Sequence, residues 1–235
     1  MRVAIIGMGT AGVSVLRQLV KYKHFKKIQL DIYDNEENMG QGKPFQNDSE
    51  DLLINVPVDM LSLNIDNILE FREWYNEQDT FNYGDADYLP RYVFGHYMKS
   101  YLEQFDHAFD NVNVIKKEVK HMYIEEQANE IIPKRIVVCT DDEVESCKDY
   151  DYVFFTIGTM SYHDPYQLKG QKGYIQAPYP ANQTLSEVKK DDTIAIIGTG
   201  LASLDVIRYA LSHHQKKPII TVSYTHLTLP TSDLV

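Results

Sequence analysis

The chain has 235 residues, of which 43% are hydrophobic, and it carries a formal net charge of −11 at pH 7. This length suits one large or two ordinary domains, and the apolar fraction suffices for a hydrophobic core. Nucleic acids and anionic membrane surfaces are disfavoured as partners, because both require basic protein surface. No apolar run reaches the roughly 18 residues of a membrane-spanning helix. The two cysteines, Cys139 and Cys147, predict neither a disulfide framework nor a metal site, so the expected compartment is the reducing cytoplasm.

The first twelve residues carry the strongest local signal. An apolar run at residues 3–6 leads into GMGTAG at residues 7–12, and apolar residues at helical spacing follow. A Gly-x-Gly-x-x-Gly pattern is common by chance and becomes informative between a strand and a helix. In a dinucleotide-binding turn, Gly7 permits the tight turn, Gly9 lets the backbone approach a pyrophosphate, and Gly12 allows the helix to pack closely.

The start of that helix and an acidic residue downstream complete the predicted dinucleotide site. The free N–H groups of the first helical turn, which includes Thr10 and Ala11, would face the phosphates, where the helix dipole adds roughly half a positive charge. A second apolar run, residues 28–32, is followed by Asp34, which lies 34 − 12 = 22 positions after the last glycine. A carboxylate about 20 residues on accepts hydrogen bonds from a ribose. The alternative is a glycine-rich turn with a surface aspartate and no ligand.

A loop at residues 35–47 contains two more glycines of interest. Gly40 and Gly42 stand on either side of Gln41, just past the acidic end of the second strand. This spacing allows the backbone to lie flat against a ligand. A flexible surface loop is the alternative interpretation.

The next segments are predicted to be extended and then helical. An apolar run at residues 52–57 is broken by a proline, and alternating apolar residues up to position 65 favour an extended chain. A helix is expected from residue 66 or 67, and Pro90 suits the first position of a second helix. The side chains expected on the buried faces of the two helices are Ile68, Leu69, Phe71, Trp74 and Tyr75, then Tyr92, Val93, Tyr97, Tyr101, Leu102 and Phe105.

Arg91 stands at the start of that second helix. A positive charge gains nothing from the helix dipole at this end, so Arg91 is expected to have an anionic partner. Either a carboxylate in the fold or a ligand phosphate would serve.

The following residues predict a β-meander inserted after the helices. Apolar residues with strand spacing occur at positions 112–124 and again at 131–139. Residues 151–159 are then expected to form a fully buried strand with a glycine turn at Gly158. The carboxyl end of a parallel strand is where α/β folds bind their ligands. Residues 160–192 are interpreted as a connection.

The opening pattern recurs toward the end of the chain. An apolar run at residues 193–197 leads to Gly198, Gly200 and Ser203, and a helical pattern follows. Serine in place of the third glycine is small enough for close helix packing. Two strand–turn–helix motifs in one chain are far more specific than either alone.

These features resemble a known group of proteins. Two dinucleotide motifs, with a strand ending in Thr156-Ile157-Gly158 between them, are the plan of two-dinucleotide flavoproteins. The sequence is similar to the FAD/NAD(P)-binding family that includes flavin-dependent urate-hydroxylase-like proteins, over about residues 1–221. The matching stretches are Gly40–Gly42 with Phe45, Leu53–Pro57 with Met60–Ser62, Pro90–Tyr97 and Gly198–Asp205.

The resemblance implies FAD in the first motif and NAD(P)H in the second. Segment 7–12 and Asp34 would hold the FAD pyrophosphate and ribose, and Gly158 would pass close to the flavin. The residues implied to line the same crevice are Asn55, Pro57 and Arg91. The expected fold is α/β: a Rossmann-like FAD-binding domain (1–165) with an inserted β-meander, a connection (166–190), and the start of a second Rossmann-like, NAD(P)-binding domain (191–221).

The last residues depart from the family pattern. Residues 222–231 resemble the in-frame translation of a sequencing adapter, so a non-native tail is expected over residues 222–235. A genuine threonine-rich terminal strand is the alternative. If the tail is foreign, the chain is a C-terminally truncated fragment, expected to be inactive although its parent is an enzyme.

The function hypothesis is an FAD-dependent, NAD(P)H-using oxidoreductase of monooxygenase or hydroxylase type, in which the cofactor carries the chemistry. No catalytic acid, base or nucleophile stands out, and neither a substrate nor an oligomeric state is predicted. One alternative is a non-enzymatic flavin-binding regulatory or interaction protein on the same fold. Two others are a disulfide-type flavin reductase, which the cysteine spacing does not suit, and a dehydrogenase that uses only the first motif.

Overall fold

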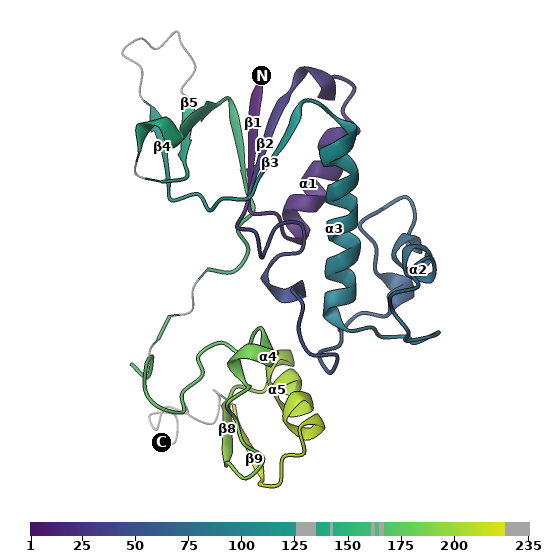
Figure 1. Ribbon diagram of the computed structural model, residues 1–235, viewed down its shortest axis with the longest axis vertical. Coiled ribbons are helices and arrows are strands. Elements are labelled where there is room, and N and C mark those ends of the chain that lie inside the picture. The colour runs from purple at the N-terminus through teal and green to yellow at the C-terminus, as the bar shows by residue number, and fades with distance from the viewer. Residues whose placement is uncertain (126–134, 142, 161–162, 165–166, 224–235) are drawn as a thin grey trace, which may run out of the picture.

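The computed structural model describes residues 1–125, 135–141, 143–160, 163–164 and 167–223. Figure 1 shows a larger first unit and a smaller second unit that contains β8, β9, α4 and α5. The first unit is built on a four-stranded parallel sheet in the order β3-β2-β1-β7. Its strands are β1 Arg2–Ile6, β2 Gln29–Tyr33, β3 Val112–Ile115 and β7 Tyr152–Phe155.

The centre of this sheet is covered on both faces. Ile5 lies opposite Ile32 of β2, and both side chains are fully buried. Helices α1 (Thr10–Val20) and α3 (Arg91–Ala108) pack on one face, as Figure 1 shows, and contribute to one large apolar core. Parallel strands with two covered faces require continuous apolar runs, which is the pattern at residues 3–6.

A meander packs on the other face of the sheet. Its strands are antiparallel and lie in the order β4 (His121–Glu125), β5 (Arg135–Cys139), β6 (Cys147–Tyr150). Val138 and Tyr150 from the meander join Ala4 in a second, smaller core. The predicted meander is therefore present, but residues 112–115 belong to the parallel sheet instead. Position 131 lies outside the described residues.

The cysteine prediction was wrong. Cys139 and Cys147 form a disulfide, because the register of β5 with β6 places them directly opposite each other. A separation of eight residues shows no disulfide pattern on its own, and only the hairpin pairing brings the two sulfur atoms together. Because disulfides persist mainly in oxidising compartments, the cysteines no longer favour the cytoplasm.

Helix α2 is shorter than expected. It spans Glu70–Asn76 rather than beginning at residue 66 or 67. The side chain of Asn67 accepts a hydrogen bond from the Leu69 amide at 3.1 Å, which forms a turn ahead of the helix. Ile68 and Leu69 are consequently exposed, contrary to the prediction. The predicted extended region before this helix includes a single-residue bridge and a 3₁₀ turn rather than a full strand.

Helix α3 begins close to its predicted start, and short 3₁₀ turns lie between other elements of the first unit. Pro90 is the N-cap of α3, so the helix begins at Arg91, one position after the predicted start, and the inward-facing positions predicted for that helix are buried or half-buried. No helix within the described ranges is both long and apolar enough to cross a membrane. The 3₁₀ turns are η1 Phe25–Lys27, η2 Lys43–Phe45, η3 Val58–Met60 and η4 Val144–Ser146.

Strand β7 is exposed, although its sequence predicted a fully buried strand. It pairs with β1 and forms one edge of the parallel sheet. Tyr152 is 60% exposed and Phe155 58% exposed. Apolar composition predicts a strand but cannot tell an edge from the centre of a sheet, because edge position depends on which other elements pair with it.

The second unit contains the recurring motif. Strands β8 (Ile194–Ile197) and β9 (Ile219–Val222) pair in parallel, and helices α4 (Ala181–Thr184) and α5 (Leu201–Ser212) pack beside them. Ile197 and Ile220 remain more than half exposed. Val222, the first residue of the predicted tail, pairs with Ile197 within the sheet, and the tail itself stays a prediction. Residues 224–235 lie outside the described part.

Candidate functional site

The first glycine motif forms a tight turn at the carboxyl end of β1. Gly7 has φ +92°, a conformation that favours glycine, and its amide donates to the Tyr33 carbonyl at 2.8 Å. A Cβ placed on Gly12 would lie 2.2 Å from the Gly7 carbonyl oxygen. The third glycine therefore permits the first turn of α1 to pack directly on the glycine turn, as its spacing predicted.

The second glycine meets the Gly40–Gly42 loop. A Cβ on Gly9 would lie 3.4 Å from Gly42 Cα, and one on Gly42 would lie 2.9 Å from Gly9 Cα. Gly42 also has φ +68° and Gly40 φ +81°. The loop is thus held against the motif by backbone contact, and two segments that the sequence predicted separately lie together.

The amino end of α1 is available for an anion. Gly9 is its N-cap, and no side-chain hydrogen bond caps this end of the helix. Thr10 and Ala11 lie in the first turn and are exposed. Uncapped amides and the helix dipole together favour a phosphate group at this position.

Asp34 follows β2 and faces the same turn. One carboxylate oxygen accepts a hydrogen bond from the Met8 amide at 2.6 Å, and the other accepts from the Asn35 amide at 2.9 Å. Burial raises the pKa of Asp34 above its ordinary value, and these amide donors oppose that rise. A half-buried carboxylate that still has acceptor capacity suits the hydroxyl donors of a ribose.

Thr156, at the end of β7, ties that strand to the motif. Its hydroxyl donates to the Gly7 carbonyl at 2.6 Å, and its amide donates to the Ile6 carbonyl at 2.8 Å. Two residues later, Gly158 has φ +71° and open space on its Cβ side. The structure therefore brings Gly158 near the motif through Thr156, a residue that sequence reasoning did not select as a site residue.

The second motif has the same geometry but fewer neighbours. Gly198 has φ +116°, Gly200 is the N-cap of α5, and no side-chain hydrogen bond caps that end. A Cβ on either glycine would meet no described atom within 4 Å. The buried Ser203 hydroxyl donates to the Gly200 carbonyl at 2.6 Å, so serine fits the third position as predicted.

Arg91 has the anionic partner that its position predicted, and this partner is a carboxylate of the fold. Its guanidinium forms an ion pair with Asp205 of α5, and the two side chains are only 16% and 5% exposed. The Tyr179 hydroxyl donates to the same carboxylate. Burial and this hydrogen bond raise the pKa of Tyr179 to about 12. Neither Tyr179 nor Asp205 was selected from the sequence as a site residue, because nothing local pairs them with Arg91.

Asn55 and Pro57 do not pack into the glycine turns of the first motif. Asn55 is exposed and, with Arg91, lines a cavity of about 160 Å³ between the two units. Leu201 and Arg208 of α5 form its opposite wall. Pro57 is half-buried and precedes η3. The expected contacts of these residues with FAD therefore remain predictions.

The FAD-NAD(P)-binding family model matches residues 4–160, which is more than half of the chain. The chain belongs to the FAD-NAD(P)-binding family. The match includes the first motif, Asp34 and Gly158, and it ends before the second motif. No curated protein sequence gives a significant match to the chain.

Three solved structures with a similar fold are a hydroxylase and two monooxygenases. Ornithine hydroxylase from Pseudomonas aeruginosa, in its reduced form, aligns with a TM-score of 0.63 at 14% identity, over 94% of this chain and 54% of that one. L-lysine 6-monooxygenase from Pseudomonas syringae gives 0.61 at 13%, over 94% and 52%. The FAD-bound cadaverine monooxygenase DfoA from Erwinia amylovora gives 0.59 at 11%, over 94% and 50%. The chain thus spans about half the length of these proteins and shares their α/β fold.

The residues of the first motif fit FAD, the cofactor that this family binds. The uncapped start of α1 suits a pyrophosphate, and Asp34 suits a ribose. The second motif has the corresponding free helix start and open space for NAD(P). The described residues contain no group of three metal-ligating side chains.

Proposed function

We propose that the chain is the cofactor-binding part of an FAD-dependent, NAD(P)H-using oxidoreductase of monooxygenase or hydroxylase type. The observation that carries this proposal is the presence of two strand–glycine–helix motifs in contacting units, each with an uncapped helix start. A single motif would suffice for a dehydrogenase and would leave the second without a role. Similarity in fold to three flavin monooxygenases supports the reaction class.

When bound, FAD would supply the redox chemistry between the nicotinamide and oxygen. The residues of the chain bind the cofactors and orient them. The N–H groups of the first turn of α1 bind a pyrophosphate, and the Asp34 carboxylate accepts hydrogen bonds from a ribose. Gly9 has no side chain, so the backbone can approach the pyrophosphate closely. In the second unit, Gly198 and Gly200 leave the start of α5 open for the nicotinamide cofactor.

Anaerobic titration tests the proposal. Purified protein is reconstituted with FAD, freed of excess cofactor, and mixed with NADH or NADPH while the visible absorbance of the flavin, which bleaches on reduction, is followed. Bleaching supports the oxidoreductase. Bound flavin that never bleaches favours a non-enzymatic flavin-binding protein, and a chain that binds no flavin contradicts the proposal.

Two further measurements separate the rival reactions. The appearance of two free thiols when the flavin-loaded protein is mixed with NAD(P)H would assign a dithiol relay of the disulfide-reductase type, whereas a Cys139–Cys147 disulfide that stays intact while the flavin is reduced argues against one. Oxygen-dependent NAD(P)H consumption is then compared with and without ornithine, lysine and cadaverine, the amines named for the similar structures. Stimulation by one of them would assign a hydroxylase.

A further inference from the structure

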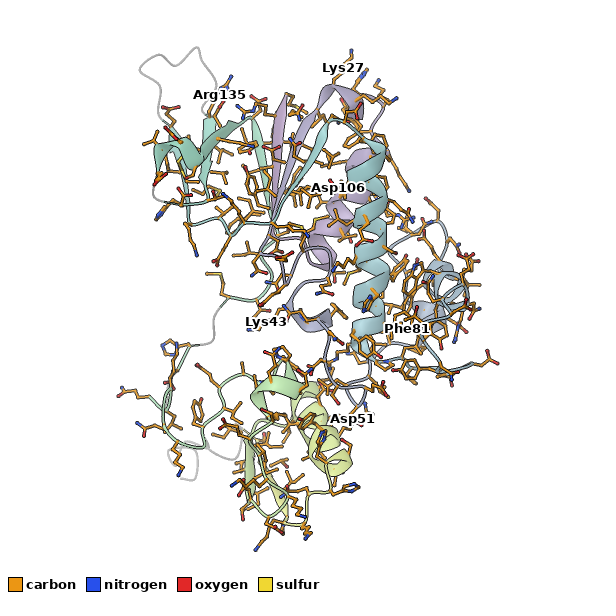
Figure 2. All side chains as sticks on the ribbon, viewed as in Figure 1. Lys27, Lys43, Asp51, Phe81, Asp106 and Arg135 are labelled. Carbon is orange, nitrogen blue, oxygen red and sulfur yellow. A yellow bond between two sulfur atoms is a disulfide. The ribbon has the colours of Figure 1, made fainter. Side chains whose placement is uncertain are left out.

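The contact between the two units is built on a short segment of the first. Residues 48–55, which we call the strap, run along α4 and α5. The Asp48 carboxylate accepts hydrogen bonds from the Ala181 and Asn182 amides at 2.7 and 2.9 Å, at the start of α4. Asp51 accepts from the Ser212 hydroxyl at 2.6 Å, and Figure 2 shows Asp51 beside the helices of the second unit.

An apolar cluster reinforces this contact. Leu52 of the strap is 1% exposed and packs with Ala181, Leu185 and Tyr209 of the second unit. These four side chains form one buried cluster with members from both units. Apolar packing supplies affinity between the units but is not directional.

Directional contacts between the two units come from the side chains of Arg91, Asp205 and Tyr179, which we call the junction triad. Arg91 Nε donates to the Leu53 carbonyl of the strap at 3.2 Å, while its terminal nitrogen pairs with Asp205 of α5. The guanidinium carbon also lies 5.2 Å from the centre of the Tyr179 ring. A single side chain of α3 thus holds the strap backbone and the second-motif helix together.

Separating the members of the triad costs free energy. Asp205 is almost fully buried, and a buried charge that loses its partner carries a large desolvation cost. Asp205 also lies five positions after Gly200, the N-cap of the same helix, so the ion pair holds α5 close to the glycine turn of the second motif. The geometry of the ion pair therefore restricts how the second motif can turn relative to the first.

We infer that the junction triad sets the orientation of the second dinucleotide motif against the first, and that Asp205 is a positioning residue for electron transfer between the two cofactors. The inference about transfer rests on the proposed function. The inference about docking rests on the contacts alone. Neither requires Asp205 to touch a cofactor.

Three variants test this: Asp205→Ala removes the charge, Asp205→Asn keeps a hydrogen-bonding group of similar size, and Tyr179→Phe removes one donor. Asp66→Asn is the control, because it breaks an exposed ion pair with Lys21 within the first unit. Hydrogen exchange followed by mass spectrometry is measured on the full chain, for peptides covering the strap, α5 and α1. Far-UV circular dichroism verifies that each variant is folded. If Asp205→Ala does not fold, Asp205→Asn and Tyr179→Phe still test the inference.

We expect Asp205→Ala to accelerate exchange at least tenfold in both the strap and α5, with α1 unchanged, because about 1.4 kcal/mol of lost docking corresponds to tenfold. Asp205→Asn and Tyr179→Phe should give smaller increases in the same two peptides, and the control none. In FAD-loaded protein, the rate of flavin reduction by saturating NAD(P)H should fall at least tenfold in Asp205→Ala, while the flavin Kd stays within about twofold.

The outcomes are separable. Exchange that matches wild type in all three Asp205 and Tyr179 variants would overturn the docking role. Faster exchange with an unchanged reduction rate would overturn the positioning role. A wild-type chain that binds no flavin would contradict the proposed function, while the exchange data would still decide whether the triad holds the units together.

Discussion

Replacing Gly12 by alanine tests the packing of the first motif most directly. The new Cβ would lie 2.2 Å from the Gly7 carbonyl oxygen, whereas ordinary contact begins at 3.4 Å, so the two must separate by 3.4 − 2.2 = 1.2 Å. The obstacle is backbone held by hydrogen bonds from Thr156 and to Tyr33, and it cannot rotate away as a side chain would. Overpacking of this kind costs about 1–3 kcal/mol, and we expect the upper end because the turn is rigid.

Part of that cost is offset, since alanine favours a helix over glycine by about 1 kcal/mol. The net loss is therefore about 2 kcal/mol, which corresponds to a melting temperature lower by roughly 4–8 °C for a chain of this size. Differential scanning fluorimetry, with and without FAD, measures the shift. Flavin affinity should fall as well, because the separated turn no longer presents its amides together.

Ser203→Ala is the matched control, because Ser203 occupies the third position of the second motif and already carries a Cβ. It removes only the hydroxyl bond to the Gly200 carbonyl, worth about 0.5–1.5 kcal/mol. A Gly12→Ala chain that melts like wild type and retains its flavin would refute the packing argument for the first motif.

Four further predictions concern the cofactors and the core. Asp34→Ala should weaken FAD binding by about 1–3 kcal/mol through loss of a charge-assisted acceptor, as measured by fluorescence titration; unchanged affinity would remove Asp34 from the site. Gly200→Val should leave the flavin bound but stop its reduction by NAD(P)H in stopped-flow traces, and an equal loss of flavin would mean that the two motifs are coupled or reversed. Asp31 is buried and accepts hydrogen bonds from Tyr150 at 2.6 Å and Asn113 at 2.8 Å. These two hydrogen bonds and the Lys148 ammonium group outweigh the effect of burial and lower the pKa of Asp31. The stabilising contribution of the Asp31 carboxylate is therefore complete above its unfolded-state pKa of about 3.9. It is lost as the pH falls through the lower pKa of the folded state. Asp31→Asn should flatten that acid limb of a urea-unfolding series, and a limb of unchanged steepness would contradict this assignment. Reduction of the Cys139–Cys147 disulfide, or Cys147→Ser, should destabilise the meander by about 2–3 kcal/mol, the range expected for a disulfide that closes a short loop. A melting temperature that is unchanged by a reductant would contradict the disulfide.

The sequence alone determined the two dinucleotide motifs and most of the elements around them. Gly12 acts within its own turn, where it packs on Gly7, and Ser203 likewise bonds to Gly200, so the spacing of these residues was informative. Gly7 and Gly9 also meet Thr156 and Gly42, contacts that the spacing alone does not predict. Asp34 lies beside the first glycine turn because parallel pairing of β1 with β2 brings the end of β2 to that turn, and its role as a ribose ligand stays a prediction. The features predicted from the sequence therefore rest mainly on neighbouring segments of the β1–turn–α1–β2 unit.

Tertiary structure decided the features that depend on pairing between distant segments. The Cys139–Cys147 bond required the register of two strands, and the exposure of β7 required knowing that it lies at a sheet edge. The partner of Arg91 lies 114 residues away, and the charge alone could not choose between a ligand phosphate and Asp205. Hydrophobic periodicity predicts which face of an element is apolar, but it does not report which other element, if any, covers that face. For that reason the motifs were readable in the sequence, whereas the contact that holds them against each other was not.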